Sequence, residues 1–180
     1  MQNAWGAGLL ALGLVCASTL TLAQDKPNVQ GGLTIEAPGH INPADLFAAT
    51  LYDLDNQPVP FKSHRGRPMI LNFWARWCPP CRVEIPELVS LQLRKTGVEV
   101  IGMNIETNPE PVRDFGRAYD INYPVFLTRA PGIDLMRSLG NVQAGLPFTV
   151  VLNKQGAVVA SRMGAMTRSQ LDAAVELALK

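Results

Sequence analysis

A short apolar run that leads directly into a pair of cysteines is the feature that most constrains the fold. Residues Met69–Phe73 (MILNF) form such a run, of the kind found in a strand buried on both faces. Cys78 and Cys81 follow closely, and residues Pro79–Lys95 then space their apolar side chains like a helix. A strand that is buried on both faces needs helices on both sides of its sheet, so this junction predicts an α/β fold.

The rest of the chain continues the alternation of strand and helix. Asn108 can cap one helix, and Thr167 with Gln170 forms a capping-box pattern at the start of the last helix. Residues 46–61 alternate like two short strands around a turn at residues 55–57. The simplest architecture is one central mixed sheet with helices on both faces and an added N-terminal β-hairpin. The further strands are predicted at residues 98–105, 124–128, 148–153 and 157–163, and the further helices at residues 108–119, 132–140 and 167–180.

Composition and charge limit the classes of protein that fit this chain. It has 180 residues, of which 47% are hydrophobic and 17% are charged, so one compact domain with some additional chain is expected. The 16 basic residues nearly balance the 15 acidic ones, and no basic run is long enough to follow a phosphate backbone. We therefore expect a monomer that has no nucleic-acid partner.

The amino-terminal segment indicates export. No charged side chain precedes Asp25, and residues 1–23 are almost wholly apolar or small, as in a signal peptide or an N-terminal membrane anchor. Both interpretations stay open, and both place the bulk of the protein in the periplasm, either free or anchored to the inner membrane. Residues 24–43 are rich in Gly, Pro and polar residues and predict an extended lead-in to a single domain at residues 44–180.

The spacing of Cys78 and Cys81 is that of a redox-active pair. A cysteine at the start of a helix lies among free backbone N–H groups and at the positive end of the helix dipole, which favours its thiolate. Cys78 is therefore expected to attack, and Cys81 to close the disulfide. A purely structural disulfide across so short a loop would stabilise little. A zinc site would need four ligands, and His40 and His64 lie far apart, so no metal is expected.

The stretch LNFWARWCPPCRVEIPEL resembles the thioredoxin superfamily, and within it the TlpA-like extracytoplasmic thiol-disulfide oxidoreductases, which include the ResA and CcmG (DsbE) groups. The similarity extends over residues 51–180 and includes the blocks GRPMILNFWA and GLPFTVVLNKQGAVV. It implies a thioredoxin-like fold. It also implies a reaction carried by the Cys78–Cys81 disulfide, without any other cofactor.

The resemblance also implies roles for residues that would bind the substrate. Pro147 matches the family's cis-proline beside the active-site disulfide, and Leu146 before it would offer backbone groups to a substrate chain. Trp77 matches the tryptophan that flanks the dithiol and forms part of the docking surface. Trp74, in contrast, is expected to pack in the core.

An acidic residue completes the expected site. Glu84 matches the glutamate of the family motif CxxExP, which adjusts the cysteines and assists proton transfer, although an exposed helix glutamate would need no special role. Asn72 stands where cytoplasmic thioredoxins have a buried Asp that relays protons, and an amide cannot titrate. We therefore expect Glu84 or water to take over that relay. Pro86 matches the proline that kinks the active-site helix.

The resemblance favours a reductase of protein disulfides. A membrane electron donor would keep the dithiol reduced, and the substrates would be exported proteins with disulfides or thiols, such as the apocytochrome of cytochrome c maturation. Two alternatives stay open: an oxidant of dithiols, and a copper(I) carrier that uses Cys78 and Cys81, with Met103 as an optional third ligand. A peroxidase of the peroxiredoxin type is disfavoured, because Ala75 stands where those enzymes carry Thr.

Overall fold

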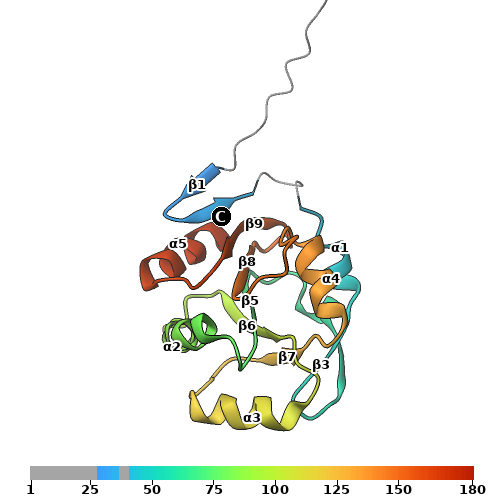
Figure 1. The fold of residues 1–180 in the computed structure, drawn as a ribbon. Coiled ribbons are helices and arrows are strands. Elements are labelled where there is room, and N and C mark those ends of the chain that lie inside the picture. Colours follow the sequence, from blue (N-terminus) through green and yellow to red (C-terminus); the bar gives the residue numbers. More distant parts are fainter. Residues whose placement is uncertain (1–27, 37–40) are drawn as a thin grey trace, which may run out of the picture.

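A mixed β-sheet forms the centre of the molecule (Figure 1). The computed structural model describes residues 28–36 and 41–180. Within these residues the sheet has nine strands in the order β1-β2-β9-β8-β5-β6-β7-β3-β4. The strands are β1 Asn28–Gln30, β2 Leu33–Ile35, β3 Thr50–Tyr52, β4 Pro58–Pro60, β5 Met69–Trp74, β6 Glu99–Asn104, β7 Val125–Leu127, β8 Phe148–Leu152 and β9 Val158–Met163.

The apolar runs of the sequence form the middle of this sheet. β5, β6 and β7 are parallel neighbours, whereas β8 and β9 run antiparallel on the other side of β5. All residues of β5 are buried, as expected for a strand that is covered on both faces. The strands predicted from the central apolar runs are confirmed, although their ends differ by a few residues.

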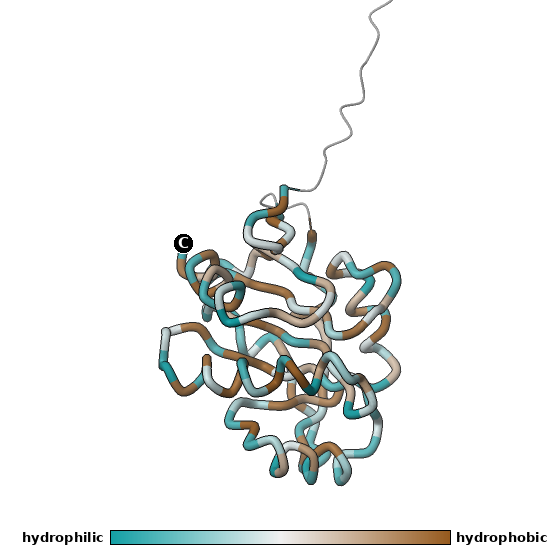
Figure 2. The backbone as a smooth tube through the Cα atoms, turned by 60° about the vertical axis from the view of Figure 1, so that its left-hand side comes forward, coloured by the Kyte–Doolittle hydropathy of each residue, from teal (hydrophilic) through white to brown (hydrophobic). Residues whose placement is uncertain are grey.

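Helices cover both faces of the sheet, as predicted. The apolar residues of β5 alternate between two hydrophobic clusters, which therefore lie on opposite faces of the sheet. Side chains of α2, α3 and α5 belong to the first cluster, which contains both cysteines. Side chains of α1, α4 and the 3-10 helix η1 belong to the second cluster. Figure 2 shows hydrophobic stretches, in brown, running through the middle of the molecule. The helices are α1 Ala44–Ala48, η1 Phe61–His64, α2 Pro79–Leu93, α3 Pro109–Ala118, α4 Pro131–Ser138 and α5 Arg168–Ala178.

The predicted helix starts are confirmed. The Asn108 side chain accepts a hydrogen bond of 3.2 Å from the backbone N–H of Glu110 at the start of α3. At the start of α5, Thr167 and Gln170 exchange the two hydrogen bonds of a capping box. These contacts satisfy backbone N–H groups that have no acceptor within their own helix.

The region before the cysteines was only partly predicted. β3 and β4 form the expected hairpin, and the Asp53 carboxylate closes its turn by accepting from the N–H groups of Asp55 and Gln57 at 2.9 and 2.8 Å. The residues just before β3 were expected to be extended, but Ala44–Ala48 form helix α1. The reason is burial: Leu46 and Phe47 both insert into the second cluster, which an alternating strand with one buried face would not allow.

The lead-in predicted for residues 24–43 contains regular structure that was not expected. β1 and β2 form a hairpin, and β2 pairs antiparallel with β9, so the hairpin extends the sheet at that edge. Leu33 anchors it in the first cluster with 1% of its surface exposed. The signal peptide or anchor predicted for residues 1–23 lies outside the described residues. In the ranges 28–36 and 41–180, none of the helices has the length and apolar character needed to span a bilayer.

Candidate active site

The two cysteines form a disulfide where β5 passes into α2. Cys78 and Cys81 are joined by an S–S bond of 2.08 Å. Cys78 is the N-cap residue of α2, and its Sγ accepts a hydrogen bond of 3.3 Å from the backbone N–H of Cys81. Pro79 and Pro80 occupy the first helical positions, where the missing N–H groups have no partner to lose. The predicted placement of Cys78 at the helix start is therefore confirmed.

Both sulfur-bearing residues are buried beside an exposed aromatic ring. Cys78 has 3% of its surface exposed and Cys81 has none. Trp77, directly before them, is 62% exposed, although large aromatic side chains usually lie in the interior. Trp74, the last residue of β5, is fully buried in the core, as predicted. The two cysteines are thus almost fully covered, while the ring of the residue directly before them is exposed.

Leu146 and Pro147 lie at the same end of the sheet as the cysteines. The peptide bond between them is cis, as expected. Phe148, the next residue, pairs with Phe73 of β5, so the cis bond lies level with the end of β5, from which the chain continues to Cys78. Leu146 is half-buried and packs against the cluster that contains both cysteines. The sheet register therefore brings two segments that are far apart in sequence to one edge.

Glu84 is buried beneath this edge, and the alternative of an exposed helix glutamate is wrong. Its side chain lies in α2, one turn after Cys81, with 1% of the residue exposed. Glu84 Oε2 accepts a hydrogen bond of 2.7 Å from the side-chain amide of Asn72. Glu84 Oε1 accepts one of 2.9 Å from the backbone N–H of Met166. Each carboxyl oxygen thus has a donor from a different part of the chain.

Burial dominates the ionisation of this carboxyl group. It raises the pKa of Glu84 to about 7, because the charged form loses its hydration. The hydrogen bonds from Met166 and Asn72 and the positive charge of Arg162 act in the opposite direction and limit the rise. A carboxyl group with this pKa can both release and accept a proton near neutral pH.

Asn72 belongs to a row of paired residues that crosses four strands of the sheet. Gly102 in β6, Asn72 in β5, Thr149 in β8 and Arg162 in β9 are successive partners in the strand ladders. Residues directly opposite one another in a sheet project from the same face, so these four share the face under α2. We call the three with polar side chains, Asn72, Thr149 and Arg162, the polar row. The row was not predicted, since only Asn72 stands near the cysteines in sequence and the pairing of β8 with β9 brings in the other residues.

A hollow of about 370 Å³ lies beside Trp77. Arg76 and Glu106 form its charged wall, with the Arg76 guanidinium 2.9 Å from Glu106 Oε1. The same carboxylate accepts the Arg76 backbone N–H at 2.9 Å and so fixes the segment before Trp77. Sequence reasoning missed Glu106, because the loop after β6 meets the cysteine segment only in the folded chain. The hollow is lined by Arg76, Trp77, Ile105, Glu106, Thr107 and Asn108.

Met103 and His64 do not lie beside the two cysteines. Among the described residues, no group of three or more His, Cys, Asp or Glu side chains is arranged to hold a metal ion. Met103, which the copper(I) alternative added to the cysteines, belongs to the cluster on the opposite face of the sheet. His64 is buried 3.5 Å from Glu99, and His40 lies outside the described residues. Met103 therefore does not join the cysteines as a third ligand, and the copper(I) alternative keeps only Cys78 and Cys81.

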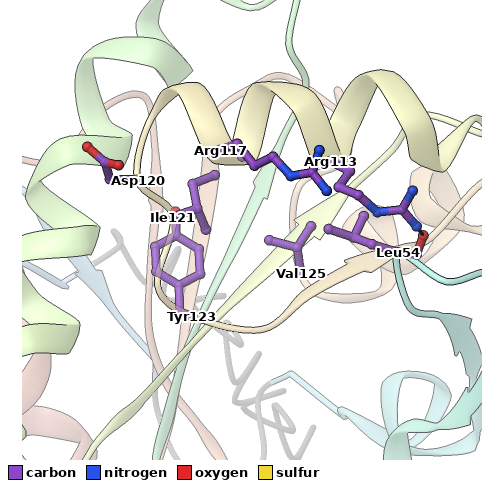
Figure 3. Close-up of a pocket in the computed structure, with 8 residues that line it drawn as sticks. Leu54, Arg113, Arg117, Asp120, Ile121, Tyr123 and Val125 are labelled. Atoms are coloured by element: carbon purple, nitrogen blue, oxygen red, sulfur yellow. Dashed lines mark hydrogen bonds between the residues drawn. The ribbon is translucent and has the colours of Figure 1, made fainter.

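A further hollow, of about 510 Å³, lies between α3 and the start of β7 (Figure 3). Arg113 and Arg117 of α3 line the hollow. Figure 3 shows Ile121 and Tyr123 at the end of the hollow opposite Leu54. Arg113 is held by an ion pair of 2.9 Å to Asp55. Neither cysteine lines this hollow.

Comparison with known proteins agrees with this geometry. Residues 40–175 match the model of the Redoxin family. The chain is 31% identical over 151 residues to the thiol-disulfide oxidoreductase ResA of Bacillus cereus (strain ZK / E33L), covering 82% of this chain and 78% of that protein.

Solved structures of similar proteins share the fold. A thioredoxin-family thiol:disulfide interchange protein from Chlorobium tepidum is 28% identical with a TM-score of 0.61, covering 74% of this chain and 96% of its own. A secreted thiol-disulfide isomerase from Corynebacterium glutamicum is 26% identical with a TM-score of 0.63, covering 73% of this chain and 83% of its own. The expected thioredoxin-like fold is confirmed.

Proposed function

Because the chain belongs to the Redoxin family and is a thiol-disulfide oxidoreductase of the ResA type, we propose that it reduces disulfides in proteins outside the cytoplasm. The observation that carries this proposal is the buried Glu84 carboxyl group one turn after Cys81. A reductase must remove the proton of its second thiol, and Glu84 supplies a proton acceptor with a pKa of about 7 in the same helix.

The proposed reaction transfers two electrons from the enzyme to the substrate. The Cys78 thiolate, stabilised at the N-cap of α2, attacks one sulfur of the substrate disulfide and expels the other as a thiolate, which takes up a proton. Cys81 then loses its proton towards Glu84 and attacks the mixed disulfide at Cys78 Sγ. The second substrate thiolate leaves and is protonated. The enzyme ends with the Cys78–Cys81 disulfide, and the substrate with two thiols.

Trp77, Leu146 and Pro147 are proposed to hold the substrate during this exchange. Trp77 offers an exposed apolar ring, which binding of a protein chain would cover. Leu146 lies half-buried at the same edge, where its backbone can pair with an extended segment. The hollow beside Trp77 would take one side chain of that segment.

The reaction consumes electrons, so the enzyme needs a donor. We propose a membrane protein with a dithiol that reduces the Cys78–Cys81 disulfide, and a periplasmic location, either free or anchored through residues 1–23. The secreted relative from Corynebacterium glutamicum supports such a location. Exported proteins whose cysteines must be kept reduced, apocytochrome c among them, are the proposed substrates.

The redox potential of the cysteine pair tests the direction of transfer. Equilibration in glutathione buffers should give a value near that of thioredoxin, about −270 mV, whereas a value near about −120 mV would identify an oxidant instead. The purified protein should also reduce a protein disulfide such as that of insulin, and Cys78→Ser should abolish turnover. Equal activity of wild type and Cys78→Ser would refute the proposal. Cys81→Ala should trap substrates as mixed disulfides with Cys78.

A further inference from the structure

Arg162 stands at the end of the polar row, on the face that Glu84 covers. It is the ladder partner of Thr149, whose hydroxyl accepts a hydrogen bond of 3.0 Å from the Asn72 amide. The same amide donates to Glu84. Residues paired in this way project to one face with their Cβ atoms about 5 Å apart, so Arg162 lies on the side of the sheet where Glu84 is buried.

The amino-terminal hairpin holds the Arg162 side chain. Arg162 Nη1 donates to the carbonyl oxygen of Gly32, in the turn between β1 and β2, and Nε donates to that of Ala165 at 3.4 Å. Gln170 of the α5 capping box donates to the neighbouring carbonyl of Gly31 at 3.0 Å. The hairpin turn is therefore attached both to Arg162 and to the start of α5.

These contacts meet the segment that donates to Glu84. Ala165, which accepts from Arg162, directly precedes Met166, and the Met166 backbone N–H donates to Glu84 Oε1. Arg162 thus acts on Glu84 in two ways: through its positive charge, and through the segment that presents the Met166 donor. Among the described residues, Tyr123 also interacts with Glu84 from a neighbouring element, and it is a buried phenol that stays neutral.

We propose that Arg162 is a positioning residue for Glu84, and that the β1–β2 hairpin keeps it in place through Gly32. The hairpin is then part of the active-site support, although it lies outside the βαβ core that carries the cysteines. This inference rests on the proposed role of Glu84 in proton transfer. What it adds is that the ionisation of Glu84 depends on Arg162 and on the hairpin turn.

Direct titration of Glu84 tests the inference without reference to electron transfer. The carboxyl carbon of Glu84 can be followed by carbon-13 NMR in the oxidised full chain, and the absence of its signal in Glu84→Gln identifies it. Arg162→Met should move the titration midpoint to higher pH, because a favourable charge and a held donor are both lost. Arg162→Lys keeps the positive charge, so its midpoint should lie close to that of the wild type. A midpoint in Arg162→Met equal to that of the wild type overturns the proposal.

Two glycines of the hairpin turn provide a matched pair for the second half of the proposal. Both have positive φ, +57° at Gly31 and +83° at Gly32, so an alanine is strained at either position. A Cβ on Gly32 would lie 2.8 Å from Arg162 Nη1 and would also contact the Gln170 side chain, whereas one on Gly31 meets nothing within 4 Å. Gly32→Ala should therefore move the Glu84 midpoint in the same direction as Arg162→Met, and Gly31→Ala should not.

The outcomes separate this inference from the proposed function. If the redox potential identifies an oxidant but the midpoints move as described, the direction of transfer is wrong and the role of Arg162 stands. If insulin is reduced but Gly31→Ala and Gly32→Ala leave the same midpoint, the role of the hairpin is wrong and the reductase stands. The NMR spectra that give the midpoints also show whether each variant is folded.

Discussion

The side-chain amide of Asn72 donates to Glu84 Oε2 at 2.7 Å and to Thr149 Oγ1 at 3.0 Å. One residue of the central strand therefore connects the active-site helix to the strand that begins after the cis peptide bond. An aspartate at this position would place a second acid beside Glu84. The asparagine instead supplies a donor, and so it helps the single carboxyl group to ionise in a buried place.

Replacement of Asn72 by alanine should weaken both the fold and the ionisation of Glu84. The variant leaves Glu84 Oε2 without its 2.7 Å donor in a buried site, so the free energy of unfolding should fall by about 1–3 kcal/mol in urea titrations. The Glu84 midpoint should rise in the NMR titration. Thr149→Val is the comparison: it removes the other acceptor of the amide and a weaker hydrogen bond to Glu84, so its midpoint should rise less. An Asn72→Ala midpoint no higher than that of Thr149→Val would contradict the assigned role.

Replacement of Trp77 by alanine should affect substrate binding and spare the fold. The ring is 62% exposed, so the free energy of unfolding should change by less than about 0.5 kcal/mol. With a protein disulfide as substrate, KM should increase about five- to tenfold, as for an aromatic residue at an interface. With a small disulfide, kcat/KM should stay near the wild-type value.

Trp74 is the matched control for Trp77. Its ring is fully buried in the cluster that contains both cysteines, so Trp74→Ala should cost about 3–5 kcal/mol of stability. If Trp77→Ala lost activity equally with small and protein substrates, a role in docking would be ruled out.

The parts of the site that the sequence predicts are those whose pattern lies in residues close together along the chain. Three such patterns each predict an element that the structure contains: the buried run before Cys78, the prolines that begin α2 and the capping box of α5. The cis bond at Pro147 followed from a family resemblance and not from local physics, since most X–Pro bonds are trans.

The missed features all depend on strand pairing. Arg162 belongs to the site because β9 pairs with β8 in one register, and a shift of one residue would turn it to the other face. Glu106 reaches Arg76 only because β5 and β6 are parallel neighbours that end at the same edge. The hairpin at residues 28–35 is not predicted from the sequence, because its strands are short and its turn is rich in glycine.

Glycine positions give a prediction about packing near the site. A Cβ on Gly102 would lie 3.0 Å from Trp74 Nε1 and 3.2 Å from Tyr123 Cε2, in the buried layer beside Asn72. Gly102→Ala should therefore lower the free energy of unfolding by about 1–3 kcal/mol. Gly116 in α3 has nothing within 4 Å of that position, so Gly116→Ala should stabilise by about 0.5–1 kcal/mol. Thermal or urea unfolding of the two variants should thus shift in opposite directions; equal destabilisation would contradict the open space at Gly116.

Stability should depend on pH through Glu84. Burial raises the pKa of Glu84 from its ordinary value of 4.5 to about 7, so the folded protein binds this proton more tightly than the unfolded chain does. Unfolding between these pH values therefore releases a proton, and stability must fall as the pH rises. The expected loss is about 3 kcal/mol between about pH 4.5 and about pH 7. Urea unfolding of the oxidised protein across this range measures it. Glu84→Gln has no proton to release, so its stability should fall less steeply, and parallel curves for the two proteins would show that Glu84 titrates normally.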